Sequence, residues 1–266
     1  YFSPIIRPIW NVKVAVSRLS SEHPKKEELI SNVGVAEIQH HIMKLNALGQ
    51  FLSLNLNVGE TGRKENSLAN ELGYEERNFI SGLFILLKQS LEVFNLWKLL
   101  CIHQFPLITE SLPQEKRQQL CSATFKDLIV YGPEMTSLLA SSLVRRFIED
   151  NSSTDVINRR LQELCPSIYK NENALHAKAH EIVLRAKSIK NENDRKLSLE
   201  TALDLCKKIG TRINLPAVCE LFTSVHWYEA VVEICLLTAH NYDPQNIALH
   251  FHKNREQFCN DKKKKM

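Results

Sequence analysis

The sequence predicts an all-α fold, and three observations support this interpretation. The 266 residues include only 8 Gly and 9 Pro, so few positions would interrupt a long helix. Apolar residues recur three and four positions apart over most of the chain, which places them on one face of a helix. Short polar connections join the segments that carry this pattern, as between helices that lie antiparallel to their sequence neighbours.

Residues 1–33 lack this pattern and form a poorly defined N-terminal segment. Pro4 and Pro8 are expected to interrupt any early helix, because proline has no backbone N–H to donate. The alternating valines of residues 12–16 predict a short strand. Residues 20–24 predict a loop.

Residues 34–258 carry the helical pattern and form one predicted helical segment. Its first apolar stripe covers residues 35–52. Residues 54–66 contain Asn, two Gly and several charges, which predicts a loop. A long helical region then covers about residues 67–105, with a break near Gly73 as the alternative.

The long helical region is apolar on nearly all sides at residues 83–87. We therefore expect it to be covered on more than one face. Pro106 and Pro113 are expected to end it and to bracket a turn. Leu99, and Leu164 further along the chain, are predicted core residues.

Shorter helices follow the turn at short intervals. Pro133, Pro216 and Pro244 each suit the first turn of a helix, and Asp243 is a good N-cap. Gly210 suits the position just after a helix. The predicted helices are at residues 114–130, 133–149, 154–164, 173–189, 194–209, 216–225, 228–240 and 244–258.

The order of these helices indicates how they are arranged. No repeat of fixed sequence period is present, whereas a regular tetratricopeptide or HEAT array should show one. An irregular stack of helix pairs and a compact bundle are the alternatives. Consecutive helices joined by short turns favour antiparallel neighbours stacked in order.

The charge argues against a nucleic-acid-binding domain. The net charge of +4 is fully supplied by the lysines of residues 262–265, so the body of the chain is neutral. A nucleic-acid-binding domain normally has a basic face. Residues 259–266 are read as a basic tail, most simply a solvated loop.

The seven cysteines indicate a reducing, intracellular compartment. Their number is odd, their spacing is wide and no C-x-x-C motif is present. Most of them fall in apolar helical patterns, where cysteine behaves as a small buried hydrophobe. We also expect no transmembrane helix, because no apolar run reaches the roughly 18–20 residues that span a bilayer.

Candidate chemical motifs are weak. His176 and His180 are four residues apart on a predicted helix, a spacing that suits zinc, but no third ligand has a matching position. Cys101 and His103 are two residues apart and would point away from each other on a helix, so we expect a core cysteine beside a peripheral histidine. No catalytic pair or metal site is predicted from these four residues.

Two further motifs do not require a catalytic or ligand-binding role. Residues 59–64 contain glycines and a lysine but lack the spacing of a phosphate-binding loop. Phe222, Trp227 and Tyr228 would serve either as an aromatic anchor for a peptide or as a contact that fixes two helices at a turn. The residues alone therefore predict an α-helical interaction module, with no catalytic residue, cofactor or metal.

Three longer strings carry a resemblance. They are LWKLLCIHQF at residues 96–105, TFKDLIV at residues 124–130 and LQELCPSIY at residues 161–169. Residues 228–233 and 243–251 continue it. In this order the strings resemble the nucleoporin 155 family, the large inner-ring scaffold nucleoporins, over most of the chain.

The resemblance implies a position and a role. Members of this family have an N-terminal β-propeller followed by a long, irregular α-solenoid of stacked antiparallel helix pairs, and this chain resembles the early to middle part of that solenoid. Because it begins with Tyr1, we read it as a fragment of a longer protein. The resemblance implies a non-enzymatic, protein-binding scaffold of the nuclear pore complex at the nuclear envelope, which supports nucleocytoplasmic transport.

The expected partners are other nucleoporins or a protein or peptide. No small-molecule substrate, nucleic acid or direct membrane insertion is expected, and no binding residues are transferred from the family. The alternative is a helical adaptor that binds a peptide or a regulatory or chromatin factor. Exposed aromatic side chains along a concave groove would favour the adaptor.

Overall fold

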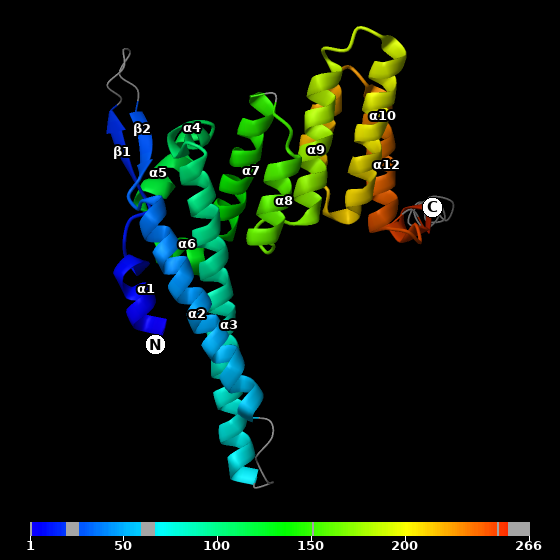
Figure 1. Cartoon of the computed structure of the whole chain (residues 1–266). Coiled ribbons are helices and arrows are strands. Elements are labelled where there is room, and N and C mark those ends of the chain that lie inside the picture. Colours follow the sequence, from blue (N-terminus) through cyan, green and yellow to red (C-terminus); the bar gives the residue numbers. More distant parts are fainter. Residues whose placement is uncertain (1, 20–26, 60–66, 151, 249, 255–266) are drawn as a thin grey trace, which may run out of the picture. The chain divides into compact units, whose positions relative to one another are not determined.

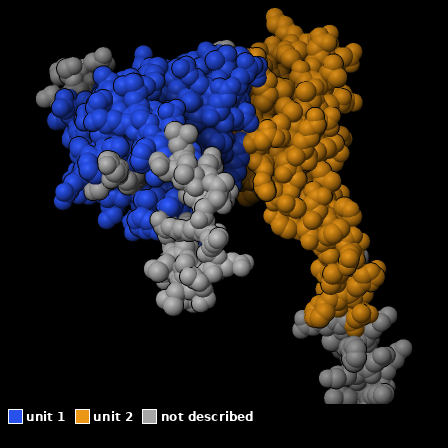
Figure 2. Space-filling model, turned by 60° about the horizontal axis from the view of Figure 1, so that its bottom comes forward, with its two compact units in different colours: residues 1–170 blue, residues 171–266 orange. Residues whose placement is uncertain are grey.

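The computed structural model describes residues 2–19, 27–59, 67–150, 152–248 and 250–254. These residues are almost all helical, with a single two-stranded hairpin among them (Figure 1). The chain divides into two compact units, residues 1–170 and residues 171–266 (Figure 2). Residues 2–19 and 27–33 therefore belong to the same unit as the helices that follow them, and the predicted basic tail lies outside the described residues.

The first unit begins with α1 and a β-hairpin and continues through seven helices. Its elements are α1 (Phe2–Trp10), β1 (Ala15–Leu19), β2 (Glu27–Ser31), α2 (Val35–Gly59), α3 (Ser67–Ile102), α4 (Phe105–Glu110), α5 (Gln114–Ser122), α6 (Phe125–Val130), α7 (Pro133–Glu149) and α8 (Asp155–Leu164).

The second unit consists of two helix pairs and a short 3-10 turn. Its elements are α9 (Asn171–Ala186), α10 (Glu192–Ile209), η1 (Gly210–Arg212), α11 (Leu215–Thr223) and α12 (Tyr228–Tyr242). Residues 247, 248 and 250–254 are also helical.

The expectation that prolines prevent an early helix is wrong. Pro4 lies in the first turn of α1, where the backbone N–H has no helical partner to lose. Pro8 lies inside α1, which ends two residues later. Ile6 and Ile9 are buried, and α1 packs against α2, so tertiary contacts outweigh the lost hydrogen bond.

The predicted strand is present but begins at Ala15, and its partner was not predicted. β1 pairs antiparallel with β2, with Val16 opposite Ile30. The segment before β1 is held by backbone bonds, because Val14 N–H donates to the Ala123 carbonyl at 3.0 Å. β2 begins with two glutamates and has no alternating pattern, which explains why no strand was predicted there.

Helices α2 and α3 form a long antiparallel hairpin (Figure 1). α2 continues to Gly59, so residues 54–59 of the predicted loop are helical, and residues 60–66 lie outside the described residues. α3 continues through Gly73, because one glycine costs a helix only about 1 kcal/mol. Gly49 allows close approach, since a Cβ there would lie 3.1 Å from the Leu87 side chain.

Two predicted boundaries in the first unit are wrong for local reasons. Pro106 occupies the first turn of a new helix, α4, instead of bracketing a turn. The predicted helix at residues 114–130 is two helices, because Thr124 starts α6 with a capping box. The Thr124 side chain accepts from Asp127 N–H, and the Asp127 carboxylate accepts from Thr124 N–H.

The core of the first unit contains a cluster of aromatic rings among many aliphatic side chains. Trp97 is buried against Phe105 and Phe125, with ring centroids 5.0 and 5.4 Å apart, and Phe94 lies 5.5 Å from Phe125. The Trp97 indole N–H donates to Ser31 Oγ at 2.9 Å, which ties α3 to β2. The helix that supplies Trp97 therefore positions the hairpin.

The core predictions for this unit are only partly confirmed. Leu99 is buried, but Cys101 and Leu164 are half-buried. At residues 83–87 only Leu87 is buried, and Ile85 is exposed. The stretch that is covered on more than one face lies further along α3, at residues 92–100.

Residues Asn78–Ile102 of α3 are long and apolar enough to cross a membrane, judged by length and composition only. We expected no such segment because no uninterrupted apolar run reaches this length, but the segment meets the criteria although it contains Lys88 and Gln89. The second half of the segment contributes Phe94 and Trp97 to the core of the first unit. Because core helices meet the same criteria, the apolar composition of this half follows from packing.

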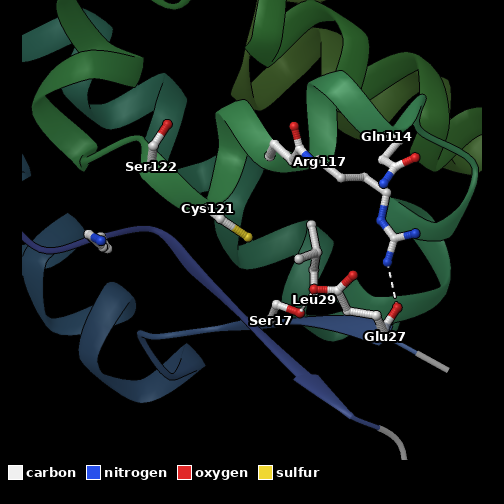
Figure 3. Close-up of a pocket in the computed structure, with 9 residues that line it drawn as sticks. Ser17, Glu27, Leu29, Gln114, Arg117, Cys121 and Ser122 are labelled. Carbon is white, nitrogen blue, oxygen red and sulfur yellow. Dashed lines mark hydrogen bonds between the residues drawn. The ribbon is translucent and has the colours of Figure 1, made fainter. Parts of the chain in front are cut away.

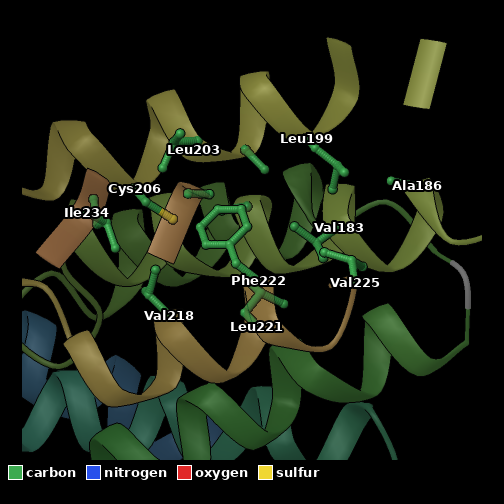
Figure 4. Packing of buried hydrophobic residues seen from close by; sticks show 13 residues of the cluster. Val183, Ala186, Leu199, Leu203, Cys206, Val218, Leu221, Phe222, Val225 and Ile234 are labelled. Atoms are coloured by element: carbon green, nitrogen blue, oxygen red, sulfur yellow. The ribbon is translucent and has the colours of Figure 1, made fainter. Parts of the chain in front are cut away.

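The second unit has an aliphatic core between α9, α10, α11 and α12 (Figure 4). Phe222 is at its centre and is the largest of the fully buried side chains there. Gly210 ends α10 with φ +67°, a conformation that favours glycine, so the predicted helix stop is confirmed. The other buried members are Ala179, Val183, Ala186, Leu199, Ala202, Leu203, Cys206, Val218, Leu221, Val225, Ala230 and Ile234.

Of the three prolines predicted to lie in the first turn of a helix, two do so and one does not. Pro133 begins α7 and Pro216 lies in the first turn of α11, as predicted. Pro244 lies in a turn instead. Asp243 caps the helical residues that begin at Ile247, because its carboxylate accepts from Ile247 N–H at 2.8 Å.

Candidate protein-binding surfaces

The two histidines with zinc spacing do not meet a third ligand among the described residues, where no group of three metal-binding side chains is found. Both lie on α9 and are half-buried. Burial lowers the pKa of His176. The adjacent Glu181 is buried and pairs with Arg185 at 2.9 Å and with Lys178 at 3.4 Å, so cations of its own helix neutralise it.

Cys101 and His103 contact different groups. The Cys101 thiol faces the Val33 carbonyl at 4.0 Å, and burial raises its pKa. His103 packs edge-on against Phe147, with ring centroids 5.2 Å apart, and burial lowers its pKa. A protonated thiol and a separately packed imidazole do not form a nucleophile and base.

The aromatic residues at the α11–α12 turn are divided between two roles. Phe222 is buried and meets Trp227 edge-on, with ring centroids 5.6 Å apart, so these two fix the helix pair. Tyr228 is exposed. Of the other motifs, Gly59 ends α2, and residues 60–66 and 262–265 lie outside the described residues.

A polar hollow of about 450 Å³ lies between the β-hairpin and α5 (Figure 3). Arg117 of α5 donates to the Glu27 carbonyl at 2.5 Å across it. Cys121 also lines the hollow, and burial raises the pKa of its thiol. With the guanidinium held by backbone and the thiol protonated, this hollow has no activated nucleophile.

A second hollow, of about 420 Å³, is apolar and lies where α1 meets α2. Ile5, Ala47, Leu48 and Phe51 line it, and Lys44 stands at its edge. Phe51 is exposed although it is large and apolar. A groove of this kind suits one apolar side chain of a bound segment.

Helix α12 carries an exposed apolar stripe. Tyr228, Val232 and Leu236 are each more than half exposed and are spaced four residues apart, so they lie on one face. Their opposite face, with Ala230 and Ile234, is buried in the second unit. A helix that is apolar on two faces is typical of a stack in which a further element covers the outer face.

These observations describe helices stacked in order, with apolar outer faces and no catalytic arrangement among the described residues. A family profile described as non-repetitive/WGA-negative nucleoporin C-terminal matches residues 1–266. The chain belongs to this nucleoporin family. The resemblance to large scaffold nucleoporins of the 155 type is thereby confirmed.

Individual relatives agree with the nucleoporin family. The chain is 28% identical over 229 residues to nuclear pore complex protein Nup154 of Drosophila melanogaster, a match that covers 85% of the chain and 16% of that protein. It is 24% identical over 284 residues to nucleoporin NUP170 of Chaetomium thermophilum, covering 100% of the chain and 19% of that protein. The chain therefore spans about a fifth or less of these relatives.

The fold of this nucleoporin segment is also confirmed. The crystal structure of Chaetomium thermophilum Nup170 SOL superposes with a TM-score of 0.79 at 22% identity, covering 94% of this chain and 33% of that one. The chain is an all-α solenoid segment, as predicted. Of the alternatives that the helix order left open, the irregular stack is correct and the compact bundle is wrong.

The sequence did not indicate either hollow or the outer stripe of α12. Both hollows involve residues 1–33, where only a short strand and a loop were predicted. The stripe was detectable in principle, because Tyr228, Val232 and Leu236 repeat every four residues beside the buried set. A helix was predicted at residues 228–240, but its apolar residues were not assigned to faces.

Proposed function

We propose that this chain is a structural segment of the nuclear pore complex, located at the nuclear envelope, and acts as a protein-binding scaffold that supports nucleocytoplasmic transport. The match of the nucleoporin family to the whole chain is the observation that carries this proposal. Stacked helix pairs provide an extended surface, and in this proposal the segment acts by positioning other proteins on that surface. The segment performs no catalysis in this role.

The partners in this proposal are other nucleoporins. The exposed stripe of α12 supports a protein partner, because isolated exposed apolar residues are common but an aligned set marks a contact surface. Contacts with small molecules, nucleic acid or the inside of a membrane have no part in the proposal.

Localisation combined with crosslinking tests the proposal. The full-length protein that contains this chain, tagged in its own cell, is expected at the nuclear rim and crosslinked through this segment to other nucleoporins. The double variant Val232→Glu and Leu236→Glu is expected to lose crosslinks at α12. The matched control is Val156→Glu on α8, which is as exposed as these residues. A rim signal without any nucleoporin crosslink to residues 1–266 would contradict the scaffold role.

A second candidate is a helical adaptor for a peptide. The apolar hollow between α1 and α2 favours it, because Phe51 and Leu48 form a small pocket with Lys44 at its edge. In this case a short peptide with one apolar and one acidic residue would bind in the hollow and shield the Phe51 side chain from solvent. The crosslinks to nucleoporins would then be absent. The two candidates therefore give opposite results in the same experiment.

A further inference from the structure

Two cysteines of the second unit lie close together. The sulfur atoms of Cys219 on α11 and Cys235 on α12 are 3.7 Å apart. Both side chains are half-buried, whereas Cys206 in the same unit is fully buried. A small oxidant in solution therefore has access to the pair and not to the core thiol.

We propose that Cys219 and Cys235 form a reversible disulfide that links α11 to α12, with a small-molecule disulfide such as glutathione disulfide as the oxidant. A disulfide bond is about 2.05 Å long, so the two sulfurs must approach each other by about 1.7 Å. Rotation of the two side chains supplies this distance. The helices need no rearrangement, because Phe222 and Ile234 already hold them against one core.

The exchange takes place in two steps that conserve thiols and electrons. The thiolate of one cysteine attacks glutathione disulfide, which forms a mixed disulfide and releases one glutathione thiolate. The second cysteine thiolate attacks the protein sulfur of that mixed disulfide and releases the second glutathione. Two protein thiols are oxidised, one glutathione disulfide is reduced to two glutathione molecules, and these take up the two protons.

The environment makes this reaction slow at neutral pH. Burial, and after it the hydrogen bond and charge of Cys235, raise the pKa of the Cys219 thiol. Since only the thiolate attacks, few molecules are reactive at any moment. The disulfide therefore responds to a sustained change in redox conditions and not to a brief one.

The linkage closes a short loop. The two cysteines are 16 positions apart in the sequence, and a crosslink over such a loop restricts the unfolded chain. The helix pair should accordingly unfold at a higher temperature when oxidised, by about 12–24 °C for a unit of this size. The same coupling makes the disulfide form more readily in the folded chain than in the unfolded one.

The experiment uses the chain with Cys259→Ser, because residues 255–266 lie outside the described part. It is equilibrated with mixtures of reduced and oxidised glutathione, folded and in urea, and unreduced peptides are analysed by mass spectrometry. The Cys219–Cys235 peptide is expected with an equilibrium constant at least about tenfold larger in the folded chain. Cys101 and Cys121, which are half-buried in the first unit, serve as internal controls and are expected to form only glutathione adducts.

Single-cysteine variants test whether the link depends on the position of the two thiols in the fold and not only on their reactivity. Cys219→Ser and Cys235→Ser should each abolish the linked peptide and the rise in melting temperature. The proposal is overturned if the folded chain forms the link no more readily than the unfolded chain. It is equally overturned if oxidation lowers the melting temperature, or if Cys219 and Cys235 are recovered only as separate glutathione adducts.

Discussion

The two units of this solenoid segment reach the same architecture with different cores. In the first unit, Trp97 and Phe125 lie among other aromatic rings, and polar side chains are buried with them. In the second unit, Phe222 meets Trp227 edge-on and otherwise lies in a cluster of mainly alanine, valine and leucine side chains. The first core therefore adds a cluster of aromatic rings to its many aliphatic side chains, whereas the buried set of the second contains one aromatic side chain, Phe222.

The contacts that close the two cores also differ in sequence distance. In the first unit, Trp97 bonds Ser31 across 66 positions, and buried Glu92 accepts from Ser167 N–H at 2.8 Å across 75 positions. In the second unit, helices that adjoin in sequence form the main pairs, α9 with α10 and α11 with α12. The irregular first unit therefore depends on specific contacts between residues far apart in sequence. A regular helix pair needs only an apolar stripe on each of its two helices.

Replacing Trp97 should have the largest effect. Trp97→Ala removes the ring that joins α3 to α4 and α6, together with the indole hydrogen bond to Ser31, at a cost of about 4–5 kcal/mol. Hydrogen exchange is the suitable measurement, because one unfolding free energy does not describe a chain of two units. Exchange should accelerate throughout residues 27–149 and stay unchanged in α9 to α12.

The conservative variant Trp97→Phe is the control for this prediction. It keeps most of the ring and loses the indole N–H. We therefore expect the free energy of unfolding to fall by about 1–2 kcal/mol and hydrogen exchange to accelerate in β2. Equal acceleration in both units would contradict the idea that the two cores are separate.

Replacing Phe222 tests the second core in the same way. Phe222→Ala should cost about 3–4 kcal/mol, because the surrounding side chains are small and close the cavity only in part. The exposed Tyr228→Ala, six positions along the chain, is the matched control and should cost less than about 0.5 kcal/mol. Exchange should accelerate in α9 to α12 for the first variant only.

These differences explain which parts of the fold the sequence could predict. Pro133, Pro216 and Gly210 act within one turn of the chain, so the starts of α7 and α11 and the end of α10 were predicted correctly. The boundary at Thr124 was missed although its capping box is also local, because apolar spacing continued across it. Most of the second unit follows from such local rules.

The missed features depend on distant partners. α1 forms around two prolines because it packs on α2, and β2 forms because β1 lies beside it. The close pair Cys219 and Cys235 had no sequence signal, since 16 residues and a turn separate them. Neither surface of the candidate site was predicted, because exposure depends on which neighbour covers a helix.

Two leucines on α8 differ in burial and are therefore expected to differ in their contribution to stability. Leu164 was predicted to be a core residue, and truncating a core leucine costs about 2–5 kcal/mol, but Leu164 is half-buried. We now expect about 1 kcal/mol for Leu164→Ala and about 3 kcal/mol for Leu161→Ala, whose side chain is fully buried. Hydrogen exchange of the α8 amides compares the two variants, and equal costs would refute this assignment.

Acid should affect a helix cap in the first unit and spare the corresponding caps in the second. Hydrogen bonds from the Thr124 side chain and backbone lower the pKa of Asp127 in α6. The caps of α10 and α11 are the amides Asn191 and Asn214, which do not titrate. A carboxyl whose pKa is lowered by folding stabilises the fold above its ordinary pKa and loses that contribution as the pH falls through the lower value.

The Thr124 amide reports this loss directly, because it donates to Asp127 Oδ2 at 2.9 Å. Its NMR chemical shift should titrate with a midpoint below 3.8, the ordinary value for the pKa of an aspartate, and Asp127→Asn should abolish the transition. The Ala217 amide, which donates to Asn214, should not move over the same range. Thr124→Ala should cost about 1 kcal/mol at neutral pH and less in acid, because the carboxylate bond is already lost there. A midpoint at or above 3.8 would mean that the capping box does not favour the ionised carboxylate, and the difference in acid response between the two units would disappear.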